Sequence, residues 1–307
     1  MLKGVKKVYL KARYSNPIAK ESKYKFENRS KDSNVMLMVL AGYKPLLWSN
    51  VFRRLKNYCP DYIDVCLVSS GKYSDELSKL CEKNHWSYLS LKRNNINLAQ
   101  NTAISLFKKA NYIIKMDEDI FVTEHSIENL ISRYEEIKKD SKYYPGTISP
   151  LINLNGYSYL KILEAYGLVD EYKKRFGEAR FDGHNKPIEH SIDAAEMMWG
   201  ITGELPKLDD LSREISTKIK DNYSACPIRL TIGMFLMERS FWEDMGMFRV
   251  RRFVSDFGND ENEINKHAIW NSKAMLYDHS TVVGHFSFHY QDENMQKVFK
   301  EHTEYFN

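Results

Sequence analysis

The stretch that decides the fold begins with VMLMVLAGYKPLLWSNVFRRLKNY, residues 35–58. Its first part, Val35–Gly42, is a continuous apolar run that ends in glycine, which is typical of a strand buried on both faces of a parallel sheet. The following segment, Pro45–Tyr58, has apolar side chains at helical spacing and a proline near its first turn. The stretch therefore predicts a strand followed by a helix.

The same alternation continues as far as Met116. We expect further strands at Ile63–Gly71, Trp86–Lys92 and Asn111–Met116, and helices at Ser74–His85 and Leu98–Ala110. Strands that alternate with helices favour an α/β fold with a doubly wound, mostly parallel sheet. Ligands of such sheets bind beyond the carboxyl ends of the strands, so candidate residues lie within 41–44, 69–71, 93–97 and 117–119.

The pattern is looser further along the chain. After a helix at Ile127–Lys139, residues 150–225 look mainly helical, and a strand with a short helix is expected within Ile228–Gly246. A helix at Asn259–Lys273 and strand-like segments within Lys273–Tyr290 follow. We therefore divide the chain into an N-terminal arm (1–33), a main domain (34–290, with halves 34–120 and 121–290) and a C-terminal tail (291–307).

Composition excludes several classes of protein. The 307 residues are 43% hydrophobic and 28% charged, as in a globular protein. A net charge of +4 is too small for a protein that coats nucleic acid. Residues 1–31 nevertheless hold ten Lys and Arg against two acidic residues, so this basic arm is a candidate for peripheral contact with an anionic membrane.

Targeting and redox signals are few. The sequence contains no run of 18 apolar residues, so no transmembrane helix is predicted. The first residues lack the apolar core of a signal peptide. The four cysteines form no CxxC pair, so we expect buried, reduced thiols. These signals together favour a cytoplasmic location, with a possible peripheral position at the inner face of the cell membrane.

Several nucleotide and hydrolase motifs are missing. The turn after the first strand is AGYKP, which has one glycine where a dinucleotide-binding Rossmann domain needs GxGxxG. The sequence also lacks GxxxxGK[ST], GxSxG and HExxH. A nucleotide could still bind this sheet if a metal handled its phosphates.

A run of three acidic residues, Asp117-Glu118-Asp119, directly follows the fourth buried strand. Because strand side chains alternate, we expect Asp117 and Asp119 on one side and Glu118 on the other. Two carboxylates spaced in this way can address Mg²⁺ or Mn²⁺ and a nucleotide diphosphate attached to it. A solvated acidic turn is the plainer alternative.

These features resemble the glycosyltransferases of the A-type fold, in particular the large inverting family 2. The resemblance covers residues 34–119 well and 233–289 moderately, through VMLMVLAGYKP, DVCLVSSG, LKRNNINLAQNTAISLFKKANYIIKMDED and the DED run itself. It implies that a metal ion, Mn²⁺ or Mg²⁺, is held by Asp119, Asp117 and His285. It also implies a nucleotide-sugar site formed by Ala41, Tyr43, Ser69, Ser70, Arg93, Asn97, Asn101, Asp117 and Glu118. The two serines stand where the family commonly has an aspartate for the uracil edge.

The second half resembles the catalytic half of that family. GMFLMERSFWEDMGMFRV is followed by FGNDENEINKHAIWNSKAML, which is similar to the family's acidic pair at a helix start. On this match Asp260 and Glu261 are the catalytic pair and Glu261 is the base, with Asp256 and Glu263 as rivals. His285 in VVGHFSFH matches the family's late histidine, and His289 would share its face in an extended strand.

The resemblance implies a metal-dependent enzyme that moves one sugar from a nucleotide sugar, most simply a UDP-sugar, to an acceptor hydroxyl. A glycan, a lipid-linked molecule or a protein would be the acceptor, in cell-surface glycan or glycoconjugate synthesis. The mainly helical insertion would bind it, with Trp199 and Glu196 as candidate contacts. The alternatives are a nucleotidyltransferase that makes nucleotide sugars, a non-catalytic binding module, or a hydrolase with metal at His279, His285 and His289.

Overall fold

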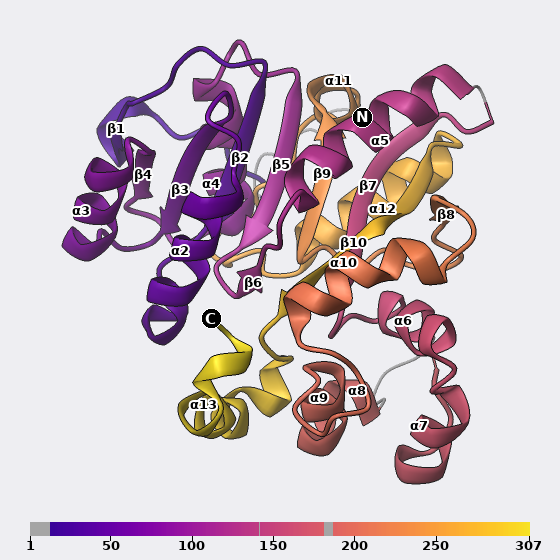
Figure 1. Cartoon of the computed structure of the whole chain (residues 1–307). Coiled ribbons are helices and arrows are strands. Elements are labelled where there is room, and N and C mark those ends of the chain that lie inside the picture. Colours follow the sequence, from indigo (N-terminus) through magenta and orange to yellow (C-terminus); the bar gives the residue numbers. More distant parts are fainter. Residues whose placement is uncertain (1–12, 141, 181–186) are drawn as a thin grey trace. The chain divides into compact units, whose positions relative to one another are not determined.

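A computed structural model describes residues 13–140, 142–180 and 187–307 of the chain (Figure 1). The fold is mixed α/β and divides into two compact units. Unit 1 comprises Met1–Tyr43, Asp61–Met116 and Met237–Asn271; unit 2 comprises Lys44–Pro60, Asp117–Leu236 and Ser272–Asn307. Residues 1–12 of the predicted basic arm lie outside the described residues.

Unit 1 contains the strands predicted from the N-terminal alternation. They are β2 (Val35–Leu40), β3 (Asp64–Ser70), β4 (Ser87–Leu91) and β5 (Tyr112–Asp117), whose last residue belongs to unit 2. The order of neighbours is β4-β3-β2-β5, and β2 with β3 and β3 with β4 are parallel (Figure 1). The predicted α/β fold with a largely parallel sheet is therefore confirmed.

The N-terminal arm contributes a strand that the sequence analysis did not predict. Residues 24–27 form β1 (Tyr24–Glu27), which pairs antiparallel with β4 and sets Phe26 opposite Leu89. The Phe26 ring meets Phe107 edge-on, with 5.9 Å between centroids. This part of the arm therefore belongs to the sheet and not outside it, because four residues are too few to give a clear alternating signal.

Two helices of unit 1 begin at side-chain caps. Ser74 accepts a hydrogen bond from Leu77 N at the start of α3 (Asp75–Asn84), and Asn95 accepts one from Leu98 N at the start of α4 (Ile96–Leu106). The Asn95 cap explains why α4 starts two residues before the predicted Leu98. Two later helices complete the unit, α11 (Arg239–Asp244) and α12 (Asn259–Trp270), both within predicted segments.

Unit 2 is built on a long strand, β10 (Ala274–His285), which pairs parallel with β7 (Pro145–Ile152). β10 also pairs antiparallel with β6 (Ile120–Phe121) and β8 (Tyr223–Ala225). β7 was not predicted, because Pro145 and Pro150 argue against a strand inside a sheet. Its eight residues are all buried, so apolar burial on both faces outweighs the missing N–H donors. A further strand, β9 (Met234–Glu238), spans the boundary at which the two units are divided.

Helices make up most of the rest of unit 2, as expected for residues 150–225. They are η2 (Pro45–Leu47), α2 (Trp48–Tyr58), α5 (Ser126–Asp140), α6 (Ser158–Tyr166), α7 (Val169–Phe176), α8 (Pro187–His190), α9 (Ile192–Met198) and α10 (Leu208–Lys218). α10 packs on β10, and α6 packs on β7. Within the stretch 150–225, residues 181–186 lie outside the described residues.

The C-terminal residues are part of the core of unit 2. They form η3 (His289–Gln291), α13 (Asp292–Glu301) and η4 (Thr303–Tyr305). The Phe306 ring is buried and lies 4.4 Å from that of Trp199 and 5.1 Å from that of Phe299, between centroids. The expectation that 291–307 is a tail is therefore wrong for this segment.

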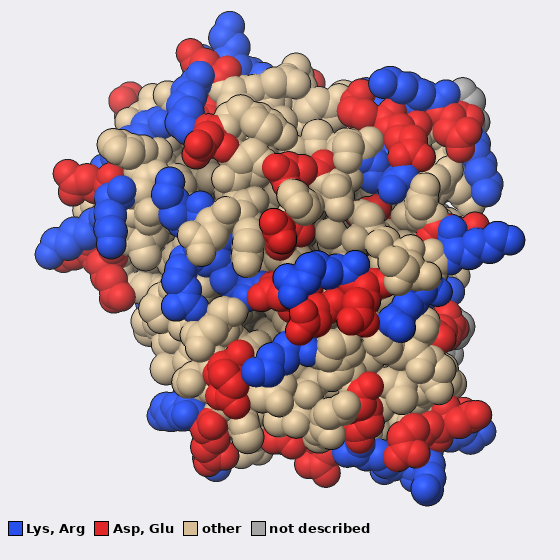
Figure 2. Space-filling view, in the orientation of Figure 1, with Lys and Arg blue, Asp and Glu red and all other residues tan. Residues whose placement is uncertain are grey.

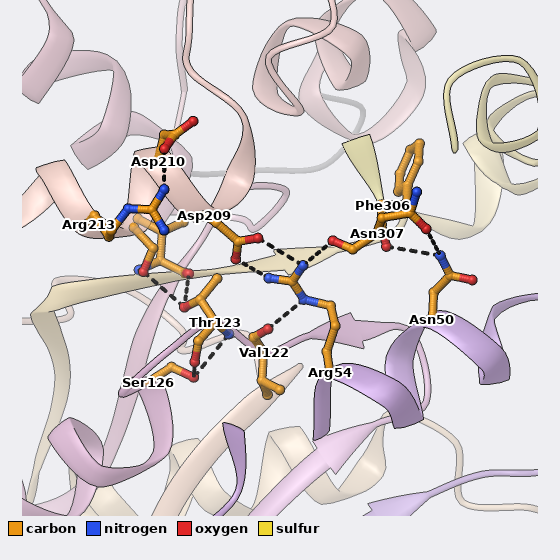
Figure 3. A network of polar contacts seen from close by, with 12 residues as sticks. Asn50, Arg54, Val122, Thr123, Ser126, Asp209, Asp210, Arg213, Phe306 and Asn307 are labelled. Carbon is orange, nitrogen blue, oxygen red and sulfur yellow. Dashed lines mark hydrogen bonds and ion pairs between the residues drawn. The ribbon is translucent and has the colours of Figure 1, made fainter. Parts of the chain in front are cut away.

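A buried arginine joins three parts of unit 2 (Figure 3). The guanidinium of Arg54, on α2, donates from Nε to Val122 O at 2.7 Å and forms an ion pair with Asp209 of α10. It also donates to the main-chain oxygen of Asn307. Nearby, Thr123 lies 2.9 Å from Ser212 and donates to Val282 O at 2.8 Å. The network fixes α2 against α10 and β10.

The surface and the thiols agree with the composition. Acidic and basic side chains are interspersed over the face shown in Figure 2. Within the described residues, no helix has the length and apolar character needed to cross a membrane. Of the four cysteines, Cys66, Cys81 and Cys226 are buried and Cys59 is half-buried.

Candidate active site

The acidic run of unit 2 forms a turn between two strands. β5 ends at Asp117, and Glu118 and Asp119 lead into β6. The expected alternation therefore stops at Asp117, and a turn sets the direction of the next two side chains. Main-chain O of Asp119 accepts a hydrogen bond from Phe286 N at 2.9 Å, which brings the end of β10 beside the turn.

Asp119 is buried and holds two cationic or potentially cationic groups. Its Oδ2 lies 2.8 Å from Lys44 Nζ and 3.5 Å from His285 Nε2. His285 Nδ1 lies 2.8 Å from Leu154 O, which can only accept, so Nδ1 carries a proton and Nε2 faces the carboxylate. The predicted pair of Asp119 and His285 is thus brought together within unit 2.

Lys44 bridges two carboxylates. Besides Asp119, its Nζ lies 3.0 Å from Oδ1 of Asp292, which also accepts from the Ser287 hydroxyl. The sequence analysis noted Lys44 in the turn AGYKP but gave it no role, and it missed Asp292 altogether. The signal for Lys44 was its place after the first strand, while Asp292 is far away in the sequence and had none.

The charges of this cluster, Lys44, Asp119, His285 and Asp292, support one another. Burial alone would raise the pKa of Asp119, but His285 and Lys44 hold that pKa below the usual range of a carboxyl group. Burial alone would lower the pKa of Lys44, but Asp119 and Asp292 raise it above its ordinary value. Both Lys44 and Asp119 are therefore charged at neutral pH.

The cluster does not fit a resident metal ion. Within the described residues, no three His, Cys, Asp or Glu side chains are placed to hold one. Asp117 does not join Asp119 and His285 as predicted, because the strand ends at Asp117 and the chain turns. Oδ2 of Asp119, which lies 3.5 Å from His285 Nε2, already accepts a hydrogen bond from Lys44.

Glu118 anchors the acidic turn. Its side chain is buried, and Oε2 accepts a 2.6 Å hydrogen bond from Trp48 Nε1 of α2. Its predicted place in the nucleotide-sugar site is not supported, because the carboxylate points to the helix. Lys44 and Trp48, one turn apart, thus contact Asp119 and Glu118 respectively.

In unit 1 the turns after β2 and β3 come together, as predicted for Ala41, Tyr43, Ser69 and Ser70. The hydroxyl of Tyr43 donates to Ser70 O at 2.6 Å, and Lys72 Nζ lies 4.4 Å from the Tyr43 ring centroid. Main-chain N of the buried Ala41 donates to Val68 O at 2.9 Å. The Tyr43 side chain is 57% exposed, so its ring is accessible for stacking.

Both serines hold these turns through their hydroxyls. Ser69 Oγ donates to Lys72 O at 2.7 Å and lies 2.8 Å from the Tyr88 hydroxyl. Ser70 Oγ accepts from Asn95 N at 2.7 Å. Gly71, which follows the two serines, must be glycine for two reasons. Its φ is +85°, and an added Cβ would lie 2.5 Å from Asn94 Cβ.

The polar residues of the loop before α4 and of α4 itself contact other segments of unit 1. The Arg93 guanidinium donates to Ser15 Oγ at 3.0 Å and to Arg251 O. Asn101 donates to Phe248 O at 2.8 Å and accepts from Trp242 Nε1 at 2.9 Å. These contacts give Arg93 and Asn101 packing roles, which argues against their predicted nucleotide contacts.

Asn97 and Gln100 differ from these two. Asn97 Nδ2 donates to Arg249 O at 2.9 Å and Gln100 Nε2 to Asp260 at 2.9 Å. Both side chains are buried, and the amide oxygen of each has no hydrogen-bond partner within the described residues. The sequence analysis missed Gln100, although its spacing of three from Asn97 places both on one face of α4.

The acidic pair opens α12, as predicted. Asp260 is buried and accepts the amide of Gln100, and Glu261 is half-buried. The rivals are occupied: Asp256 accepts from Arg251 N at 2.8 Å and Asn95 Nδ2 at 2.7 Å.

Glu263, the other rival, accepts from Arg249 N at 2.7 Å and Asn259 Nδ2 at 2.9 Å. Burial raises its pKa. Of the four acidic candidates, Asp260 and Glu261 therefore remain open as the base.

The predicted acceptor contact Trp199 lies in the core of unit 2. Its side chain is 1% exposed, its ring meets Phe121 edge-on at 5.3 Å between centroids, and Nε1 donates to Phe286 O at 3.3 Å. No face of the indole is left for a sugar to stack on. The EMMW cluster thus serves packing, while Glu196 beside it is half-buried and burial raises its pKa.

The histidine predictions are also corrected. β10 ends at His285, so the exposed His289, which begins η3, does not share a strand face with it. His279 is buried between Ser224 Oγ at 2.8 Å and Asp221 O at 2.7 Å. The alternative metal site of three histidines is therefore not formed.

Comparisons with known proteins point to the family that the sequence resembles, the glycosyltransferases of the A-type fold. Residues 49–192 match the family described as Glycosyl transferase family 2. A search among curated proteins finds no match.

Among solved structures, the chain is similar to the crystal structure of GalNAc-T7 with UDP, GalNAc and Mn²⁺. The TM-score is 0.51 and the identity 13%, over 85% of this chain and 45% of that one. The chain thus spans less than half of that protein, and the likeness concerns the fold.

A cytidylyltransferase from Leptospira borgpetersenii serovar Hardjo-bovis also matches, with 11% identity over 39% of this chain and 53% of that one. Its TM-score of 0.29 carries no argument. Together, the family match over 49–192, the largely parallel α/β sheet and the GalNAc-T7 likeness show a fold of the glycosyltransferase A type, and the chain is similar to glycosyl transferase family 2.

Proposed function

We propose that this glycosyltransferase moves one sugar from a UDP-sugar to an acceptor hydroxyl with inversion at the anomeric carbon. The observation that carries the proposal is the charged cluster that follows β5, where Asp119 meets Lys44 and His285 just past the carboxyl end of that strand. The exposed ring of Tyr43, next to Ser70, is suited to stacking on a nucleotide base.

The proposed reaction is a single displacement. A carboxylate takes the proton of the acceptor hydroxyl as that oxygen attacks the anomeric carbon. The bond from this carbon to the diphosphate breaks, and the diphosphate oxygen keeps the electron pair. Glu261 is the proposed base, because it is half-buried at the start of α12 whereas the Asp260 carboxylate is buried against Gln100.

The cofactor stays a prediction. Mn²⁺ or Mg²⁺ was expected on Asp119, Asp117 and His285, and the GalNAc-T7 structure contains Mn²⁺. Because the described residues do not offer a three-ligand set, we route no step of the reaction through a metal. The acceptor class, whether glycan, lipid-linked or protein, also stays a prediction, and no described residue is assigned to it.

The test begins with donor identity. Purified protein is screened by thermal shift against nucleotides and nucleotide sugars, with Mn²⁺ and with EDTA, because a ligand of the folded state raises the melting temperature. The stabilising donor is then incubated with candidate acceptors, and the anomeric configuration of the product is read by NMR.

Two variants test the roles. Asp119→Asn should weaken donor stabilisation, while Glu261→Gln should retain donor binding and lose transfer. Glu263→Gln is the control on the same helix. If no donor of the panel binds, or if Glu261→Gln transfers sugar at the wild-type rate, the proposed donor class or the proposed base is wrong.

We also propose a cytoplasmic location with peripheral contact to an anionic membrane. The basic arm motivated this, and the loop between α11 and α12 adds support. Phe253 and Phe257 in that loop are 95% and 87% exposed, and Arg252 N beside them donates to Arg13 O at 2.9 Å. Exposed aromatic rings flanked by arginines suit a lipid surface. Flotation with phosphatidylserine liposomes should fall for a Phe253→Ser, Phe257→Ser variant, and unchanged flotation would contradict the idea.

A further inference from the structure

The cluster around Asp119 is where a cation for the donor's diphosphate is to be sought. A departing nucleoside diphosphate gains negative charge as the sugar leaves, so a cation must face it. The described residues provide no three-ligand set for a divalent metal. They do provide an ordered cation at the same carboxylate, the ammonium of Lys44.

The position of Lys44 is fixed at both ends. Its main-chain O accepts from Leu47 N at 3.0 Å at the start of η2, and Pro45 at the first position of that helix restricts the backbone. Its Nζ is held by Asp119 at 2.8 Å and Asp292 at 3.0 Å. The lysine side chain is therefore ordered before any ligand binds.

The ammonium still has capacity for a ligand. It carries three N–H donors, and the contacts among described residues use two of them, one on each carboxylate. The side chain is 28% exposed, so the third donor has access to solvent. One phosphate oxygen can accept that donor without displacing either carboxylate.

A metal ion would have to compete with this arrangement. A metal–oxygen bond of about 2.1 Å to Oδ2 of Asp119 would require Lys44 to leave that oxygen, since an ammonium and a divalent cation repel each other at such distances. Lys44 and a metal are thus alternatives at Oδ2, the oxygen that also faces His285.

We propose that Lys44 is the cation that binds the diphosphate of the donor in this chain, in place of a divalent metal. The inference rests on the proposed function and specifies the charge chemistry of that same site. Lys44 stabilises the diphosphate as the bond to the anomeric carbon breaks, and its proton stays on the ammonium throughout. Asp119 and Asp292 position Lys44, and His285 adds a second nitrogen at Asp119.

The test measures equilibrium binding of UDP by calorimetry, so that it does not depend on turnover. Wild-type protein should bind UDP in EDTA about as tightly as in Mn²⁺. Lys44→Met should lose at least about tenfold in affinity in EDTA, the size expected for one charge-assisted hydrogen bond. UMP, which lacks the second phosphate, should lose less, and Lys44→Arg should restore part of the UDP affinity.

The matched control is Lys161→Met. Lys161 is also in unit 2, its side chain is 27% exposed, and its Nζ lies 3.0 Å from a carboxylate oxygen of Glu164. It should bind UDP like the wild type. A second measurement, Mn²⁺ binding followed by electron paramagnetic resonance without nucleotide, should show weak binding by the wild type and tighter binding by Lys44→Met.

The outcomes separate the two ideas. UDP binding by the wild type that needs Mn²⁺ and is abolished by EDTA would overturn the role of Lys44 and leave the donor class intact. The same holds if folded Lys44→Met binds UDP in EDTA as tightly as the wild type. If neither UDP nor any nucleotide sugar binds the wild type in either buffer, the proposed function falls, and this inference with it.

Discussion

Replacing Arg54 by methionine should destabilise unit 2 by about 3 kcal/mol. The guanidinium is buried, and the change removes its hydrogen bond to Val122 O and its ion pair with Asp209. A buried carbonyl left without a donor costs about 1–3 kcal/mol, and removing one partner of a buried ion pair costs about 3–5 kcal/mol. The Asp209 side chain is 34% exposed and regains water, so the total lies at the lower end.

The assay is thermal unfolding followed by circular dichroism. A loss of about 3 kcal/mol should lower Tm by about 6–12 °C for a unit of this size. The adjacent Arg53 provides the control. Within the part of the chain that the structure describes, its exposed guanidinium donates a hydrogen bond only to the Asn307 side chain, at 3.1 Å. Arg53→Met should stay within about 0.5 kcal/mol of the wild type.

Two results would refute this reasoning. One is an Arg54→Met protein whose Tm stays within about 1 °C of the wild type, since the network would then add nothing to stability. The other is an equal loss in Arg53→Met, which would show that charge on α2 matters and burial does not. An Asp209→Asn variant and the double variant complete a cycle, which isolates the coupling between Arg54 and Asp209.

Three further outcomes are expected. Gly71→Ala should lower the free energy of unfolding by about 2 kcal/mol, because alanine is strained at this positive φ and its Cβ would lie 2.5 Å from Asn94 Cβ. Gly167→Ala has the same backbone strain but open space around the added Cβ, so it should cost about half of that in the same melting assay. Burial alone would raise the pKa of Glu27, but hydrogen bonds from Lys25, Ser78 and neighbouring donors lower it to about 2. Its stabilising effect is therefore present above the ordinary carboxyl range and is lost as pH falls from about 4.5 towards 2, and Glu27→Gln should flatten that part of a stability–pH curve. A thiol reagent at pH 8 should label Cys59 alone in the native protein, because burial raises the pKa of Cys81 to about 12 and also raises the pKa of Cys66 and of Cys226. Labelling is followed by mass spectrometry, and a second cysteine labelled before unfolding would contradict the packing.

The N-terminal half of the fold could be predicted from the sequence because its signals are local. Strands such as β2 and β3 are continuous apolar runs ended by small residues, and helix starts carry caps such as Ser74. β7 escaped prediction because two prolines mask a strand whose stability comes from burial against β10. β1 escaped it because its partner β4 lies more than sixty residues away in the chain.

The candidate site was predicted in part for the same reason. Asp119 and His285 each follow or end a recognisable strand, and the structure brings them together. Trp199 carried an equally suggestive residue type, but only the packing of Phe121 and Phe306 around it shows that it belongs to the core. The role of Lys44, in contrast, could not be predicted. Its residue type and its place after the first strand are visible in the sequence, but its partners Asp119 and Asp292 come from distant segments that only folding brings near.

The pair of carboxylates around Lys44 has a consequence for entropy. A lysine side chain loses up to about 2 kcal/mol of rotamer freedom when it is fixed. Asp119 and Asp292 impose this loss when the chain folds, so a phosphate that later contacts the ammonium does not incur it. Since about 1.4 kcal/mol corresponds to a factor of ten in Kd, the advance ordering can raise affinity about tenfold over a mobile lysine at the same place. Two acidic groups beside an anionic ligand can thus strengthen its binding, through the order that they impose on the cation between them.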